Sequence, residues 1–379
     1  MRISTGDMTV RFALPHAVQI ALDRMEAAGY EAYPVGGCVR DFLRGITPFD
    51  FDLTTNARPE AVSRIFSDYT VVETGIKHGT VTVLVDSTPL EITTFRTDVG
   101  YSDGRHPDRV EFSSTLEEDL SRRDFTINAL AYHRVRGVID LFGGHDDLEK
   151  KRIRCVGDAS TRFTEDALRI LRGLRFASTL DFTIETATAR AMFETKETLH
   201  FVSRERITDE IARMVCGVGA ARVAREFLPI LKEIIPGLRP DFEKLQTLPP
   251  AQNLRLAALL GDVSTLSHLR LSKKDASAVK SILTSDPPIL LTRFSALSCK
   301  ARYREYANDV CIYHGVSNLD EMCGDGVYLA SQLAISGKDL LARGYEGKAV
   351  GEILSRMLLR VMRGEIKNTR ESLMNSLED

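Results

Sequence analysis

Residues 33–55 read YPVGGCVRDFLRGITPFDFDLTT, and the rest of the chain is organised around this stretch. Gly36 and Gly37 let a ligand approach the backbone closely, because neither residue has a Cβ atom. Arg40 follows shortly after them, and its guanidinium group can bind phosphate oxygens at two points. A glycine pair alone is typical of a simple turn. Together with the arginine, the pair predicts a phosphate-binding site.

Two aspartates end this stretch. Residues 49–53 are predicted to form a strand, in which Asp50 and Asp52 face one side while Phe51 faces the core. Two carboxylates on one face, close to a phosphate-binding site, suit a pair of Mg²⁺ ions. The alternative is an edge strand with a solvated face. We favour the metal site because both features occur so close together.

Composition and charge set broad limits. The chain has 379 residues and a formal net charge of −3, which does not favour a nucleic-acid partner but leaves room for local basic patches. The first residues lack the apolar centre of a signal peptide, and no apolar run is long enough to span a bilayer. The six cysteines are scattered without a C-x-x-C motif. These features predict a reduced, cytoplasmic protein.

The pattern along the chain predicts an α+β fold. The expected strands are 32–35, 49–53, 69–73, 80–85 and 90–96, and the expected helices among them are 14–29 and 59–66. A polar loop is expected at 97–108, and from residue 149 onward helices follow one another. We divide the chain into a strand-containing head (1–144) and three helical parts, a neck (145–222), a body (223–300) and a tail (301–379).

Two further groups of charged residues precede the helical part. Glu91 alternates with Leu90 and Ile92 in a predicted strand, so it is a third candidate metal ligand or a solvated strand residue. Arg122 and Arg123 are predicted to begin a helix capped by Ser121. Cations are unfavourable at a helix N-terminus. A bound anion would remove this conflict, so we expect the arginines to contact phosphate and Asp124 to cap the helix or accept from a ribose hydroxyl.

Residues 161–176 are predicted to form one helix with a buried apolar stripe. Asp166, Arg169, Arg172 and Arg175 recur at every third position beside it. A solvated salt bridge between Asp166 and Arg169 is the simpler interpretation. The more specific one is base recognition, since an Asp that accepts from an amino group beside an Arg that donates to a ring nitrogen accepts cytosine and adenine and rejects guanine and uracil.

The motifs together resemble the class II tRNA nucleotidyltransferases, the CCA-adding enzymes, which are close relatives of the bacterial poly(A) polymerases. They are GGCVRD with DFD (36–52), RRDFTINALAY (122–132), DLFGG (140–144), EDALRILRGLRF (165–176) and SRERITDEI (203–211). The resemblance implies a polymerase-β-like head followed by a helical neck, body and tail. It also implies addition of C, C and A to the 3′ end of tRNA from CTP and ATP, without a template.

By position in the motifs, the resemblance assigns a role to each candidate residue. Asp50 and Asp52 would hold metal and catalyse; Gly37, Arg40, Arg122 and Arg123 would hold the triphosphate; Asp124 would bind the ribose; Asp166 and Arg169 would read the base; and Glu165, Arg172 and Arg175 would complete that site. Residues 203–211, with Arg204 and Arg206, would brace the neck.

Several questions stay open at this level. A poly(A) polymerase, an enzyme adding only CC or only A, an inactive tRNA-binding protein and a nucleotide-sensing regulator are alternatives. The resemblance implies that CC-only enzymes differ from the full enzyme in the loop after the head strands, and the loop at 97–108 is intact here, so we favour full CCA addition. RNA contact is assigned to the helical C-terminal half. There, residues 336–350 are a candidate phosphate contact through Lys338, Arg343 and Lys348, and the alternative is a simple helix connector. The oligomeric state is open, a homodimer included.

Overall fold

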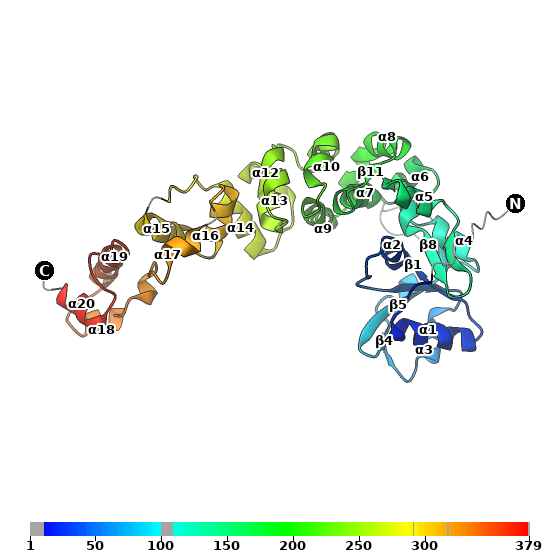
Figure 1. Cartoon of the computed structure of the whole chain (residues 1–379), viewed down its shortest axis with the longest axis horizontal. Helices are drawn as coiled ribbons and strands as arrows, with labels where there is room; N and C mark the ends of the chain where they lie inside the picture. Colours follow the sequence, from blue (N-terminus) through cyan, green and yellow to red (C-terminus); the bar gives the residue numbers. More distant parts are fainter. Residues whose placement is uncertain (1–10, 100–108, 291, 317, 378–379) are drawn as a thin grey trace. The chain divides into compact units, whose positions relative to one another are not determined.

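The computed structural model describes residues 11–99, 109–290, 292–316 and 318–377. The chain forms two compact units, the first comprising residues up to 236 together with 268–270 and the second comprising 237–267 and 271–379. The main sheet lies in the first unit, and Figure 1 shows its strands among the N-terminal helices. The expected α+β class is confirmed. The finer division into head, neck, body and tail stays a prediction.

A seven-stranded sheet forms the centre of the first unit, in the order β3-β4-β5-β2-β1-β8-β9. Its strands are β1 (Ala32–Val35), β2 (Asp52–Thr55), β3 (Thr70–Val72), β4 (Thr80–Val85), β5 (Thr88–Thr94), β8 (Leu130–His133) and β9 (Gly137–Asp140). The pair β2–β5 is parallel and the other neighbours are antiparallel, so the sheet is mixed. This topology places β2 in the interior of the sheet.

Helices cover both faces of this sheet. Helices α1 (His16–Ala27) and α3 (Pro59–Ile65) pack on one face, where Leu22, Met25, Leu53 and Ile92 share a buried apolar cluster. Figure 1 shows α1 and α3 next to each other beside β4 and β5. On the other face, α4 (Leu116–Ser121) contributes to a smaller cluster. Alternation of buried and exposed positions in β4 and β5 produces these two faces.

Further elements complete the first unit. Its other α-helices are α2 (Gly37–Leu43), α5 (Gly144–Glu149), α6 (Ala159–Glu165), α7 (Leu168–Thr179), α8 (Thr186–Thr195), α9 (Arg204–Val215), α10 (Ala220–Glu226) and α11 (Leu228–Ile234). Two short pairs accompany them, β6 (Arg96–Val99) with antiparallel β7 (Arg109–Phe112) and β10 (Arg152–Ile153) with parallel β11 (Thr183–Ile184). The start of the expected loop at 97–108 is therefore strand, and residues 100–108 lie outside the described part.

The second unit is built from helices. They are α12 (Phe242–Thr247), α13 (Gln252–Leu260), α14 (Lys273–Leu283), α15 (Arg293–Tyr303), α16 (Ala307–Tyr313), α17 (Leu319–Cys323), α18 (Gly337–Leu341), α19 (Lys348–Met362) and α20 (Arg370–Asn375). Two apolar clusters in this unit surround Leu297 and Leu340. Among the helices that the structure describes, none combines the length and apolar character needed to span a membrane.

The close approach of Gly144 to the segment around Thr126 gives a test of the fold. A Cβ at Gly144 would lie 2.1 Å from the Thr126 carbonyl oxygen, and backbone cannot move away as a flexible side chain can. We expect Gly144→Ala to lower the free energy of unfolding by about 2–3 kcal/mol, as overpacking does, in denaturant titrations. Gly351→Ala in α19 is the control, because nothing lies within 4 Å of its added Cβ. Equal stability of the two variants would contradict the described packing.

Candidate active site

The two aspartates lie where β2 begins. The strand starts at Asp52 rather than at residue 49, so Asp50 precedes it, because β1 ends opposite Asp52 and Gly36 then turns into α2 with φ 78°. The expected alternation is nevertheless present. Asp50 and Asp52 are exposed, whereas Phe51 and Leu53 are 7% and 0% exposed. Both carboxylates are therefore accessible at the start of an interior strand.

Glu91 lies beside this pair. The parallel register of β2 and β5 pairs Asp52 with Glu91, and both side chains are exposed. The pKa of Asp52 is raised to about 6, first by desolvation from the surrounding protein and then by the negative charges of Glu91 and Asp50. The positive charge of Arg123 acts in the opposite direction. A bound cation would relieve this crowding of negative charge. The electrostatics therefore fit a cation at the start of β2.

The donor set also fits a nucleotide-bound divalent ion. The described residues contain no group of three His, Cys, Asp or Glu side chains placed to hold one metal ion. Glu91 therefore neighbours the aspartates without completing a three-ligand set. Mg²⁺-type ions that bind nucleotides commonly use one or two carboxylates together with substrate phosphates. Asp50 and Asp52 meet that requirement without Glu91.

Arg123 is the arginine whose charge acts on Asp52. A Cβ at Gly36 would lie 3.0 Å from Arg123 Nη1, so the glycine leaves room for this guanidinium group. Its charge reaches Asp52, whose pKa it lowers. Arg123 Nε is buried and has no hydrogen-bond partner among the described residues. Gly36, Arg123 and Asp52 thus lie together, while Gly37 is the first residue of α2.

The expectation that Arg122 and Arg123 begin a helix is wrong. Helix α4 begins after Thr115, whose hydroxyl accepts from the Glu118 N–H at 3.3 Å, and it ends at Ser121. Arg122 is its C-cap, where a cation is favourable because the C-terminal carbonyls carry partial negative charge. The helix-dipole argument for a bound anion therefore fails. Both arginines instead bind Asp119, at 2.7 and 3.2 Å.

Arg40 is engaged by protein groups. It donates to both carboxylate oxygens of Asp41, at 2.9 and 3.0 Å, and to Asn128 Oδ1 at 2.7 Å. Its guanidinium also lies 5.6 Å from the centre of the Phe176 ring. A phosphate would therefore have to share or replace these contacts.

Asp124 is buried rather than open. Its Oδ2 accepts from Arg172 Nε at 2.8 Å, and its Oδ1 accepts from the Phe125 N–H at 2.8 Å and from Asn128 Nδ2 at 3.1 Å. Burial alone would raise the pKa of Asp124, but the Arg172 charge and these hydrogen bonds lower it to about 2. A ribose hydroxyl would meet a carboxylate that already has three donors.

The expected single helix over 161–176 is wrong. Helix α6 ends at Glu165, Asp166 is extended with φ −137° and ψ 99°, and α7 begins at Leu168. Asp166 Oδ1 accepts from the Leu168 N–H at 3.0 Å. Aspartate often breaks a helix in this way, because its side chain competes for backbone N–H groups. Asp166 therefore lies at a junction rather than on the Arg169 face of one helix.

The two predicted base-reading residues have different partners. Arg169 is 7% exposed and donates to Glu165 Oε2 at 2.9 Å and to the Arg122 carbonyl at 3.1 Å. Asp166 Oδ2 instead accepts from Arg206 Nη2 at 3.3 Å. The structure thus brings a carboxylate and a guanidinium together, and the partner of Asp166 in this pair is Arg206 of α9.

The Phe176 ring lies against the last two predicted site arginines. Arg172 and Arg175 lie 5.5 and 4.4 Å from its ring centre. Arg175 Nε is 2.9 Å from Glu210 Oε2 of α9, without hydrogen-bond alignment. Burial lowers the pKa of Arg175 and raises that of Glu210. The ring therefore carries guanidinium groups from both α2 and α7.

Sequence reasoning missed four of these residues. Asp119, Asn128, Phe176 and Glu210 hold predicted site arginines or Asp124, yet none was singled out. Asp119 carries a usable signal, since it lies three and four residues before two adjacent arginines. Glu210 carries none, because its partner Arg175 is distant in sequence.

Two segments match known families. Residues 32–154 match the family described as "Poly A polymerase head domain". Residues 181–239 match "Probable RNA and SrmB- binding site of polymerase A". The first segment contains the aspartate pair and Arg123. The second contains Arg206 and Glu210.

Relatives match along nearly the whole chain. The CCA-adding enzyme of Limosilactobacillus reuteri (strain DSM 20016) is 37% identical, over 94% of this chain and 95% of its own. That of Lactobacillus gasseri is 37% identical, over 100% and 99%. The crystal structure of the Bacillus stearothermophilus CCA-adding enzyme in complex with CTP is similar with a TM-score of 0.80 and 31% identity, covering 96% of this chain and 97% of that one.

The buried Asp124 predicts a distinct pH dependence of stability. Its pKa of about 2 lies below the ordinary 3.8, so its contribution is complete above about pH 4 and is lost as the pH falls towards 2. We expect Asp124→Asn to lose about 2 kcal/mol at neutral pH, and the deficit to shrink below about pH 4. Urea titrations at several pH values measure this difference.

Asp181→Asn is the matched control. Asp181 pairs with Arg222 at 3.1 Å, but its side chain is 61% exposed, so the change should stay within about 0.5 kcal/mol. A deficit of Asp124→Asn that is constant from neutral to acid pH would contradict the ion pair.

Proposed function

Because this chain belongs to the CCA-adding enzyme family, we propose that it adds C, C and A to the 3′ end of tRNA, using CTP and ATP and releasing pyrophosphate. The observation that carries the proposal is the group at the start of β2, in which Asp50 and Asp52 are both exposed and the charge of Arg123 reaches Asp52. The family depends on a divalent metal ion, which we propose to be Mg²⁺.

The reaction joins the tRNA 3′-oxygen to the α-phosphorus and breaks the bond between that phosphorus and the pyrophosphate. When bound, the metal ions supply activation of the 3′-hydroxyl and neutralise charge on the triphosphate. We assign Asp50 and Asp52 to holding them, with Glu91 as a neighbour. Arg122, Arg123 and Arg40, with the backbone at Gly37, orient the phosphates through charge and close approach. Such positioning provides most of the catalysis in phosphoryl transfer.

Nucleotide choice is assigned to the segment from Glu165 to α7. Asp166 would accept from the amino group of cytosine or adenine, and Arg169 would donate to the ring nitrogen. The role of Asp166 is supported by its position at the helix junction, where its side chain is 16% exposed. Arg169 would have to share its guanidinium with Glu165. Asp124, Arg172 and Arg175 would complete the site beside Phe176.

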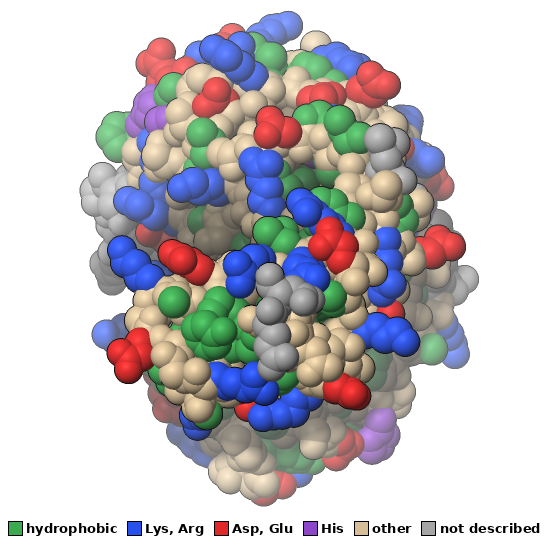
Figure 2. All heavy atoms as spheres, turned by 90° about the vertical axis from the view of Figure 1, so that its left-hand side faces the viewer, with side chains coloured by type: hydrophobic (Ala, Val, Ile, Leu, Met, Phe, Trp, Pro, Cys, Tyr) green, Lys and Arg blue, Asp and Glu red, His purple; other side chains and the backbone are tan. Residues whose placement is uncertain are grey.

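The helical C-terminal half is the part of the chain that we propose to bind tRNA. Figure 2 shows Lys and Arg side chains spread over the drawn face with Asp and Glu side chains between them. A net charge of −3 still allows individual basic side chains to contact the RNA backbone. An enzyme that serves many tRNAs needs contacts to RNA backbone and shape rather than to sequence. We also propose a cytoplasmic location, in keeping with six free cysteines.

An incorporation assay tests the activity. With Mg²⁺ and labelled CTP and ATP, we expect tRNA that ends before the CCA triplet or after CC to grow and stop at CCA, and intact tRNA to stay unchanged. Asp50→Ala and Asp52→Ala should each lower the rate by more than about a thousandfold, since they remove metal binding worth several kcal/mol. Long A tails on unrelated RNA would indicate a poly(A) polymerase. No incorporation would favour a binding protein.

A second experiment tests nucleotide choice. We expect Asp166→Ala to reduce the preference for CTP and ATP over UTP and GTP by about ten- to a hundredfold, as loss of a charged hydrogen bond does. Arg169→Ala should reduce the preference in the same way, because it removes the proposed donor to the ring nitrogen. Competition assays with paired nucleotides measure the ratio. Arg162→Ala is the control, because Arg162 also binds Glu165, at 2.8 Å, and has no assigned contact to the base. An unchanged ratio in Asp166→Ala would refute base reading.

A further inference from the structure

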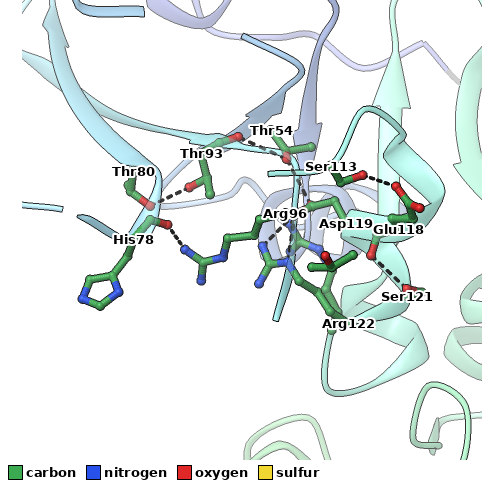
Figure 3. Close-up of polar contacts among 12 residues, drawn as sticks. Thr54, His78, Thr80, Thr93, Arg96, Ser113, Glu118, Asp119, Ser121 and Arg122 are labelled. Carbon is green, nitrogen blue, oxygen red and sulfur yellow. Dashed lines mark hydrogen bonds and ion pairs between the residues drawn. The ribbon is translucent and has the colours of Figure 1, made fainter. Parts of the chain in front are cut away.

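Asp119 forms a buried junction between the catalytic strand and the two predicted phosphate-binding arginines. Its side chain is 0% exposed, yet all of its acceptor capacity is directed at specific partners. Oδ1 accepts from Arg122 Nε and Nη2 at 3.0 and 2.7 Å. Oδ2 accepts from Arg123 Nη2 at 3.2 Å and from Thr54 Oγ1 at 3.0 Å. Figure 3 shows Asp119 between Thr54 and Arg122.

The Asp119 carboxyl group stays ionised in this position. Burial would raise its pKa, but the charges of Arg122 and Arg123 lower it overall. An ionised carboxylate buried beside two guanidinium groups forms short, directional hydrogen bonds. It therefore fixes the arginines more firmly than a solvated ion pair would.

Thr54 connects this junction to the aspartates. It lies two residues after Asp52 in β2, so both side chains project from the same face of the strand. Thr54 is 0% exposed, and its hydroxyl is also 3.3 Å from the Thr93 carbonyl oxygen of β5. The hydroxyl has one proton, and the ionised Asp119 is the nearer and stronger acceptor.

Helix α4 is itself held in place. Glu118 Oε2 accepts from Thr115 Oγ1 at 2.9 Å and also from Ser113, and Ser121 Oγ donates to the Glu118 carbonyl at 2.8 Å. Figure 3 shows these contacts on the side of α4 next to Asp119. Leu120 is fully buried in the smaller apolar cluster on the α4 face of the sheet. Asp119 is thus presented from a helix with little freedom to move.

We propose that Asp119 is a positioning residue that holds Arg122 and Arg123 for the triphosphate and ties them to β2. It does not contact the substrate. Without its charge, Arg123 is free to turn to Asp52, whose carboxylate its charge already reaches. That pairing would remove a phosphate contact and occupy a metal-binding carboxylate. The inference rests on the proposed function, because it takes the nucleoside triphosphate as the ligand.

The chain contains a matched control for this test. Asp147 is also 0% exposed, and it also binds two arginines, Arg152 and Arg154, and one threonine hydroxyl, that of Thr126. None of these partners lies in β2. Asp147→Asn therefore reproduces the loss of a buried charge between two arginines without touching the catalytic strand.

Equilibrium binding of CTP with Mg²⁺, without tRNA, separates positioning from folding. We expect Asp119→Asn to weaken CTP binding by about tenfold or more, as the loss of one charged contact does, and to raise the KM for CTP while the KM for tRNA stays unchanged. Asp147→Asn should lose similar stability and keep the wild-type Kd for CTP within about twofold. A wild-type Kd in folded Asp119→Asn would overturn the proposal, as would an equal rise in both variants.

Thr54→Val keeps the test decisive if Asp119→Asn does not fold. This change removes one hydrogen bond and leaves every charge in place. We expect about a threefold weaker affinity for CTP, the effect of a modest hydrogen bond, and recovery in Thr54→Ser. An unchanged affinity would overturn the link to β2. Wild-type protein that binds no CTP and incorporates none would instead refute the proposed function, so the two failures are distinguishable.

Discussion

The ion pair between Asp124 and Arg172 joins two parts of the site that are 48 residues apart in the sequence. Asp124 follows α4 and the two arginines bound to Asp119, and Arg172 lies in α7, which carries Phe176 and Arg175. Removing Arg172 would leave the Asp124 carboxylate, whose side chain is 8% exposed, as a poorly solvated charge. The pair therefore fixes α7, which carries the predicted base-reading Arg169, against the segment that follows α4.

Carboxylates bind arginines throughout the first unit, and those of Asp119 and Glu210 are buried. Asp119 binds Arg122 and Arg123, Glu165 binds Arg169, and Glu210 lies against Arg175. Arg40 and Arg172 also have acidic partners. All six predicted substrate-binding arginines therefore already lie beside a carboxylate. A triphosphate would bind to guanidinium groups that are oriented beforehand, so less side-chain entropy is lost on binding.

The local patterns predicted much of this arrangement. Period-two alternation placed Asp50 and Asp52 on one side and Phe51 in the core, although the strand begins later than expected. The same pattern placed Glu91 on the face opposite Leu90 and Ile92, and the β2–β5 register puts it beside Asp52. Two expectations failed for local reasons. Thr115 begins α4 instead of Ser121, and the Asp166 side chain interrupts the helix predicted over 161–176.

The sequence by itself determined the strand-containing head, the helical remainder, the family and the residue types of the site, because each of these depends on periodicity or on short motifs. Only the tertiary structure decided which charges meet. Arg206 reaches Asp166, Asn128 bridges Arg40 and Asp124, and Phe176 gathers arginines from two helices. The physical reason is that ion pairs and ring contacts form between surfaces brought together by packing, and sequence spacing predicts only neighbours within one helix or strand.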